Sequence, residues 1–152
     1  MPLNYIKKYL SKTDLEELKN EIGKIESETS GEIRLCLKIK RGYHERKLTP
    51  RELALKEFFK LEMNKTVDKT GILIFILFEE KKFEIIADDG INSKIQQDIW
   101  DLIINHIKTE FSSGNYKTGL VKCLNEIGKI LIKEFPVKQG DKNELPNDIV
   151  IE

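Results

Sequence analysis

Carboxylates are the side chains of this sequence best placed to do chemistry. Asp88 and Asp89 directly follow a short apolar segment that predicts a strand, and loops at strand ends are where α/β folds bind ligands. If this strand forms a hairpin with the preceding one, its last residues lie beside Asp68. If an earlier strand runs parallel to the same neighbour, Glu32 and with it Glu28 reach the same edge.

Several carboxylates at one edge repel one another unless a cation neutralises them. An oxygen-rich set without Cys or His suits Ca²⁺ or Mg²⁺ rather than zinc, and the spacing is not that of an EF-hand. We therefore predict a metal site made from separate loops by Asp88, Asp89, Asp68 and Glu32. The alternative is that Asp88 caps the next helix, Asp89 and Gly90 form a turn, and Asp68 is only solvated.

Other familiar catalytic patterns are missing from the sequence. The two Gly-Lys pairs, at residues 23–24 and 128–129, are followed by Ile rather than Ser or Thr, so neither is a phosphate-binding loop. Cys123 has Lys129 six residues later, where a cysteine-dependent phosphatase needs an arginine. No GxSxG, HExxH or GxGxxG pattern occurs. We assign no catalytic residue and leave open whether the protein is an enzyme.

Charge and hydropathy restrict the partners. The 152 residues include 26 basic and 26 acidic side chains, which gives no net charge, and no basic stripe marks a nucleic-acid surface. The longest apolar run, residues 72–78, is too short to cross a bilayer, and the N-terminus has no secretory signal pattern. We expect a cytoplasmic monomer with no nucleic-acid partner and no membrane insertion, in which Cys36 and Cys123 are reduced packing residues.

The elements that must position these residues follow from periodicity. A capping box at residues 13–16 predicts an amphipathic helix to about residue 28, and alternation over residues 33–39 predicts a strand with one buried face. Thr49 and Pro50 begin a second helix. Residues 72–78 are apolar at every position, which predicts a central strand covered on both faces.

The second half of the sequence completes the sheet and its cover. A polar turn leads into a strand at residues 83–87, and two further helices are predicted after Ser93 and after a break at residues 112–115. A right-handed crossover makes the first two strands parallel. We predict a three-layer α/β/α sandwich with a small mixed sheet of about four strands. Residues 1–136 form one domain, and residues 137–152 form a polar tail with a short strand at 148–152.

Several segments together resemble one known family. They are residues 26–34 (ESETSGEIR), Met63 with Lys65 and Thr66, residues 71–74 (GILI), residues 87–92 (ADDGIN), Trp100, and residues 143–146 (NELP). Their order and spacing resemble the TPM-domain family over residues 15–146, in a form without the transmembrane anchor and Gly-rich tail of its membrane members. The resemblance implies an α/β/α sandwich and divalent-cation binding, and Asp88 is the position that carries over most readily.

Three functions are open. The resemblance favours a non-enzymatic regulatory or interaction module, since the family includes a modulator of nematode acetylcholine receptors. A thylakoid member with acid phosphatase activity makes a metal-assisted phosphatase the second function, although Arg34, Arg41, Arg46 and Arg51 offer no evident phosphate clamp. The third is a metal-free protein-binding domain that uses exposed helix faces.

Overall fold

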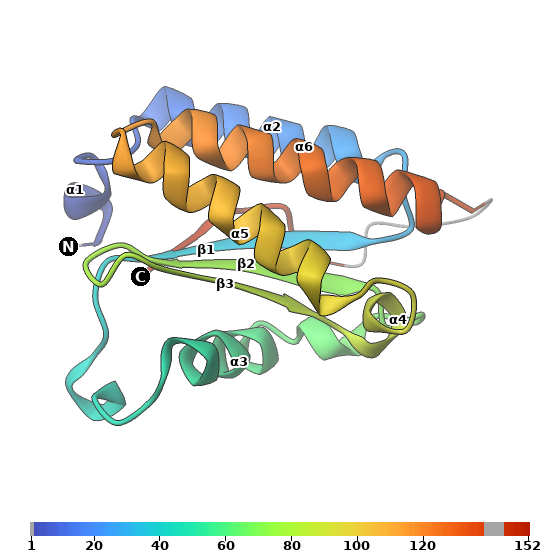
Figure 1. The fold of residues 1–152 in the computed structure, drawn as a ribbon, viewed down its shortest axis with the longest axis horizontal. Helices are drawn as coiled ribbons and strands as arrows, with labels where there is room; N and C mark the ends of the chain where they lie inside the picture. The colour runs from blue at the N-terminus through green and yellow to red at the C-terminus, as the bar shows by residue number, and fades with distance from the viewer. Residues whose placement is uncertain (1, 139–144) are drawn as a thin grey trace.

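A four-stranded mixed sheet with the order β3-β2-β1-β4 forms the middle layer of the protein (Figure 1). The structure is a computed structural model and describes residues 2–138 and 145–152. Helices cover both faces of the sheet, so the predicted three-layer α/β/α sandwich and its sheet of about four strands are confirmed. Residues 139–144 of the predicted polar tail, 137–152, lie outside the described residues.

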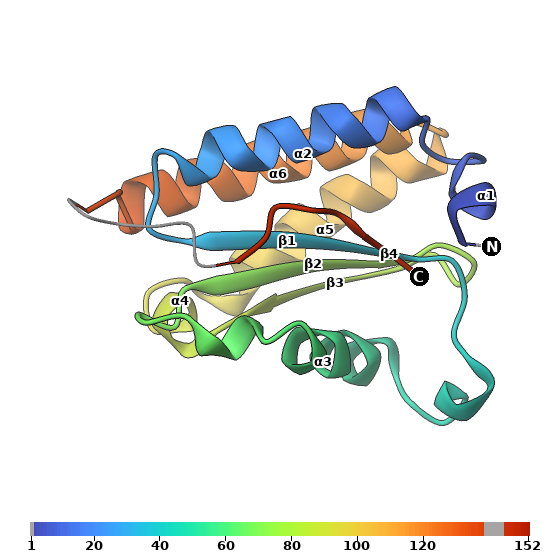
Figure 2. The ribbon, with the colours of Figure 1, turned by 180° about the vertical axis from the view of Figure 1, so that it is seen from behind.

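The two central strands are parallel, as predicted. Strand β1 (Glu32–Lys38) pairs with β2 (Gly71–Leu77), with Glu32 opposite Gly71. Every residue of β2 is buried, which confirms that this strand is covered on both faces. The prediction that β1 has only one buried face is wrong, because Arg34 and Cys36 on its polar side are buried too. The segment before β4 runs beside this strand (Figure 2), and Arg34 Nη2 donates to Asp148 O in that segment.

The edge strands come from the hairpin and from the end of the sequence. Strand β3 (Lys82–Ala87) is antiparallel to β2, as the polar turn predicted. Strand β4 (Val150–Ile151) pairs in parallel with β1 and is shorter than the predicted segment 148–152. Backbone hydrogen bonds extend this pairing, since the Glu152 N–H donates to Leu37 O.

One face of the sheet carries most of the helices. Helices α1 (Pro2–Ile6), α2 (Lys12–Glu26), α5 (Gln97–Ser112) and α6 (Tyr116–Glu134) lie on this side. The apolar faces of these helices pack on the side of the sheet that carries Ile33 and Ile72, and together they form the larger of two hydrophobic cores. The capping box of α2 is formed by Ser11 and Asp14, two residues before the predicted start at Thr13.

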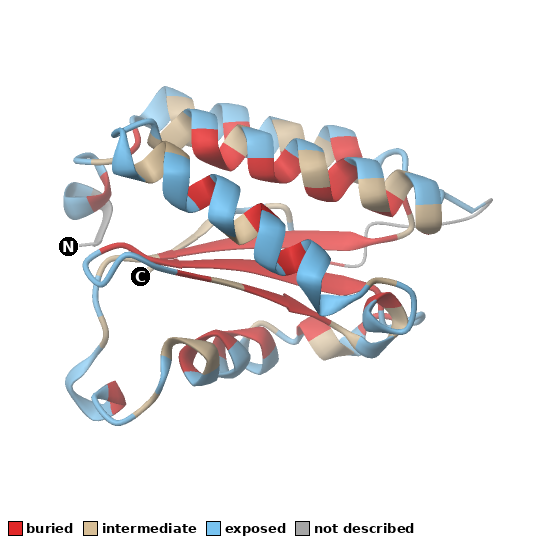
Figure 3. Ribbon diagram, in the orientation of Figure 1, coloured by how far each residue is buried: buried red, intermediate tan, exposed pale blue. Residues whose placement is uncertain are grey.

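Helix α3 (Pro50–Lys60) covers the opposite face, flanked by two 3-10 turns, η1 (Tyr43–Glu45) and η2 (Met63–Lys65). The predicted cap is confirmed, because the side chains of Thr49 and Glu52 each accept a hydrogen bond from the other's backbone N–H. The buried sheet between the layers is visible in Figure 3.

The helix predicted from Ser93 onward begins later, as α5 at Gln97. A short helix that was not predicted, α4 (Asp89–Asn92), directly follows β3. Within residues 2–138 and 145–152, no helix is both long enough and apolar enough to span a bilayer.

Candidate functional site

The predicted carboxylates lie at the sheet edge where β1 and β2 begin and β3 ends. Glu32 pairs with Gly71 across the parallel strands, and the Asp88 N–H donates to Gly71 O at 2.9 Å. Glu32, Gly71 and Asp88 therefore occupy one row across three adjacent strands. We call this region, with residues 66–70 and 87–92, the loop edge.

Asp88 is the N-cap of α4, and its carboxylate is held in a defined orientation. Its Oδ1 accepts a hydrogen bond from the Asp89 N–H at 2.8 Å. Its Oδ2 is buried, and no donor among the described residues bonds to it. The capping alternative is therefore correct for one oxygen, while the second oxygen lacks the partner that buried polar atoms normally have.

The loops that carry Asp68 and Asp88 touch through their backbones. The Gly90 N–H donates to Lys69 O at 2.9 Å. A Cβ at Gly90 would lie 2.3 Å from Asp68 O and 2.5 Å from Lys69 O. This approach is possible only for a residue without a side chain, so the sequence places glycine where the two loops come together.

The Asp68 side chain takes part in a neighbouring hollow. Its Oδ2 lies 3.2 Å from Lys138 Nζ, and both side chains are about half exposed. A hollow of about 350 Å³ beside this pair is lined by Ser30, Asp68, Thr70, Lys94, Glu134, Phe135, Pro136, Val137 and Lys138. Asp88 and Asp89 do not line this hollow, and the Asp89 side chain is exposed to solvent.

Glu32 is buried and contacts a carboxylate that the sequence did not suggest. It is 3% exposed and interacts with Glu26 of α2, whose Oε2 accepts the Ile33 N–H at 2.7 Å. Burial, together with the charge and hydrogen bond of Glu32, raises the pKa of Glu26 to about 8, against the lowering effect of the Ile33 N–H. Burial and the neighbouring Glu32 therefore favour the protonated form of Glu26. Glu28, in contrast, is exposed.

The predicted ligands thus share the loop edge without forming a closed ligand shell. Within residues 2–138 and 145–152, the one group of three ligand side chains whose atoms lie within 4.8 Å of one another is Cys36, Glu57 and Glu152. Spacing and periodicity could not predict this group, because the three residues come from three distant segments. Both cysteines are free and buried, as expected of reduced packing residues.

Arg34 is unsuited to clamp a phosphate at this edge. Its side chain is buried, and its Nη2 donates to Asp148 O at 3.2 Å. The basic side chains that reach the hollow are instead Lys94 and Lys138.

Comparison with known proteins identifies one family, and the similar solved structures include two NMR structures. The model of the TPM domain matches residues 5–130. The NMR structure of the BA42 protein from the psychrophilic bacterium Bizionia argentinensis is 35% identical, with a TM-score of 0.83 over 93% of this chain and 94% of that chain. The NMR structure of an N-terminal domain from P. gingivalis has a TM-score of 0.69 at 17% identity, over 84% of this chain and 79% of that chain. No curated protein matches the sequence.

Proposed function

The chain belongs to the TPM-domain family, and from this premise we propose that it is a regulatory or interaction module whose loop edge binds Ca²⁺ or Mg²⁺. The ion orders the loops around Asp68 and Asp88, and a protein partner recognises the ordered surface. This function requires no catalytic residue.

The buried Oδ2 of Asp88 is the observation that carries the proposal. A buried carboxylate oxygen without a donor costs free energy, and a hard cation is the ligand that compensates such an atom most effectively. The Asp89 N–H fixes the other oxygen, so the orientation of the carboxylate is set before the ion arrives. Asp89, next to Asp88, and Asp68, on the neighbouring segment of the loop edge, supply further oxygen atoms.

The role of Glu32 in this site depends on its pairing with Glu26. A cation that recruits Glu32 draws this side chain away from Glu26, whose pKa is raised to about 8 by burial and by Glu32. We therefore regard Asp88, Asp89 and Asp68 as the first ligands and Glu32 as a ligand recruited from its carboxyl pair.

Calorimetric titration with Ca²⁺ and Mg²⁺ tests this function directly. Wild type should bind at least one of the two ions with saturation, and Asp88→Asn should bind it at least about tenfold more weakly, because it keeps the cap acceptor but loses the charge. Asp98→Asn is the matched control, since Asp98 is an exposed aspartate in the first turn of α5. An undiminished affinity in Asp88→Asn, or no saturable binding by wild type, contradicts the proposal.

Thermal unfolding gives an independent measure of the same event. An ion that binds only the folded state should stabilise it by about 2.7 kcal/mol at one hundred times its dissociation constant. The midpoint should rise on addition of the ion and return to its original value after chelation. An unfolding midpoint that changes neither on addition of the ion nor after chelation would contradict ion binding by the folded state.

A metal-assisted phosphatase is the second candidate function, and one observation favours it. Lys94 and Lys138 flank the hollow that Asp68 lines, and the Ser30 and Thr70 side chains lie beside them. Two ammonium groups can bind a phosphate as point charges, while a bound ion polarises the phosphoryl oxygen. Metal-dependent hydrolysis of p-nitrophenyl phosphate that is lost in Asp88→Asn and weakened in Lys138→Gln would support it. The absence of turnover with either ion would exclude it for this substrate.

A metal-free binding domain remains the third candidate. Ile99 and Leu102 of α5 are exposed apolar side chains, and partners captured equally with and without chelator would favour this function. The monomeric state and the cytoplasmic location stay predictions, which size-exclusion chromatography and cell fractionation would check.

A further inference from the structure

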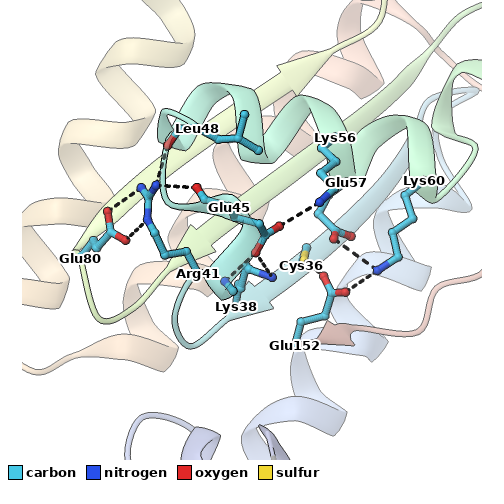
Figure 4. Close-up of polar contacts among 11 residues, drawn as sticks. Cys36, Lys38, Arg41, Glu45, Leu48, Lys56, Glu57, Lys60, Glu80 and Glu152 are labelled. Atoms are coloured by element: carbon cyan, nitrogen blue, oxygen red, sulfur yellow. Dashed lines mark hydrogen bonds and ion pairs between the residues drawn. The ribbon is translucent and has the colours of Figure 1, made fainter.

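The cluster of Cys36, Glu57 and Glu152 lies away from the loop edge, under helix α3 (Figure 4). Cys36 comes from β1, Glu57 from α3, and Glu152 directly follows β4. One ligand atom from each residue lies within 4.8 Å of the other two, and Cys36 Sγ is 3.6 Å from Glu152 Oε2. Three separate elements thus direct a thiol and two carboxylates at a common point.

Burial makes this arrangement costly for the protein alone. Cys36 is fully buried and Glu57 is 4% exposed. The Oε2 of Glu57 is buried without a hydrogen-bond partner among the described residues. Two carboxylates in contact at low dielectric repel each other strongly, so they require either a shared proton or a cation.

In the metal-free protein, a proton and one lysine balance the charge. Burial, followed by the hydrogen bond and the charge of Glu152, raises the pKa of Glu57 to about 7, and burial raises the pKa of the Cys36 thiol. Lys60 Nζ lies 2.6 Å from Glu152 Oε1 and 3.6 Å from Glu57 Oε1. Lys38 points to Glu45 instead. With Glu57 and Cys36 protonated, Glu152 and Lys60 leave the cluster neutral.

We propose that Cys36, Glu57 and Glu152 bind a thiophilic divalent cation, represented by Zn²⁺, and that this ion ties β4 to β1 and α3. A thiolate excludes Ca²⁺ and Mg²⁺ and suits zinc, which also accepts carboxylate oxygen. The ion displaces the Cys36 and Glu57 protons into solvent. The three anionic ligands, the dication and the Lys60 ammonium again sum to zero, so binding exchanges two protons for one ion without leaving buried net charge.

The separation of Cys36 and Glu152 fits a tetrahedral centre. Metal distances of about 2.3 Å to sulfur and about 2.1 Å to oxygen at tetrahedral angles place the two ligand atoms about 3.6 Å apart. The observed distance from Cys36 Sγ to Glu152 Oε2 is also 3.6 Å. Lys60 is more than half exposed, so solvent reaches this side of the cluster, and water can occupy the fourth position.

Cobalt provides a probe that reports on both the ion and its ligands. The reduced full chain titrated with Co²⁺ should develop thiolate-to-cobalt charge-transfer absorption that saturates at one ion per chain and disappears when Zn²⁺ is added. Cys36→Ser should lose this band. Cys123→Ser should keep it, since Cys123 is an equally buried thiol in the larger core on the other face of the sheet. Calorimetry of Zn²⁺ binding at pH 7 in buffers of different ionisation enthalpy should give between one and two protons released per ion, because the Cys36 thiol is protonated and the pKa of Glu57 lies at about 7.

A second variant covers the case in which Cys36→Ser does not fold. Glu152→Gln keeps the backbone bonds of β4 and should weaken Zn²⁺ binding at least about tenfold, because even the loss of a supporting group around a metal ligand costs this much. An absence of saturable Co²⁺ binding, a band that survives in Cys36→Ser, or an unchanged affinity in Glu152→Gln would overturn the proposal. Calcium binding at the loop edge should be unaffected by Cys36→Ser, so failure of one site leaves the other intact.

Discussion

At the level of single residues, the contact between the two loops of the loop edge depends on Gly90. Gly90→Ala should destabilise the protein by about 2 to 4 kcal/mol, because the new Cβ would lie 2.3 Å and 2.5 Å from two backbone oxygens that cannot rotate away. Urea unfolding measures the difference. Gly23→Ala is the control, because Gly23 lies inside α2 and a Cβ there would lie 3.4 Å from Asn147 Nδ2, an ordinary contact distance. Alanine at this position should stabilise the helix by about 0.5 to 1 kcal/mol.

A second prediction concerns Glu45, a nearly buried carboxylate. Burial would raise its pKa, but the Gly42 N–H, Lys38 and Lys56 outweigh this effect and lower the pKa to about 2. A carboxyl whose pKa is lower in the folded state stabilises the protein above its ordinary pKa of 4.5 and loses this contribution as pH falls toward 2. Glu45→Gln should therefore unfold more easily than wild type at pH 7, by about 1 to 2 kcal/mol.

The difference between Glu45→Gln and wild type should shrink as pH falls from about 4.5 toward 2. Urea unfolding at several pH values checks it, with Glu79→Gln, an exposed glutamate after β2, as the control. A gap that does not change with pH would show that Glu45 is not held as an anion.

The carboxylates illustrate which parts of a site a sequence can predict. Asp88 was identified because it directly follows an apolar strand, and its position at a sheet edge required only the hairpin and the strand order. The contact between Glu26 and Glu32 could not be predicted, because a helix residue and a strand residue meet there only through the packing of α2 on β1. The cluster of Cys36, Glu57 and Glu152 could not be predicted for the same reason.

At the level of elements, Thr29 joins the α2–β1 connection to the end of α6. Its buried hydroxyl donates to Phe135 O at 2.5 Å and to Leu131 O at 3.1 Å, and it accepts the Gly31 N–H at 3.1 Å. Thr29→Val keeps the shape but removes these bonds, and should cost about 1 to 3 kcal/mol because the Gly31 N–H loses its acceptor. Urea unfolding measures this cost, and amide exchange should show faster opening of the last turn of α6. Thr118→Val, an exposed position on α6, should change neither.

Elements with strong local signals were predicted accurately. Seven consecutive apolar residues identified β2 as the covered central strand, and the Thr49–Glu52 box with Pro50 fixed the start of α3. The prediction for β1 was wrong on one face, because the alternation of Arg34, Cys36 and Lys38 with apolar residues indicated a face exposed to solvent. That row is instead covered by α3 and by the segment that leads to β4, with Leu145 in the same small core. Such cover comes from distant parts of the chain and leaves no periodic signal.

At the scale of the whole molecule, the zero net charge conceals two separate groups of candidate ligands. Acidic side chains gather at the loop edge, and a thiol with two carboxylates lies under α3 with Lys60 beside it. The first offers oxygen atoms alone and the second includes sulfur, so the two sites should select different cations. The fold separates them, because one lies where the central strands begin and the other lies within the sheet face.

Amide NMR during titrations with Ca²⁺ and with Mg²⁺ tests the central claim most directly. With at least one of the two ions we expect saturable shifts concentrated at the loop edge, in residues 66–70 and 87–92, and their loss in Asp88→Asn. Wild-type spectra that change with neither ion, or saturable shifts confined to the opposite end of the sheet near Tyr9 and Ile39, would contradict it.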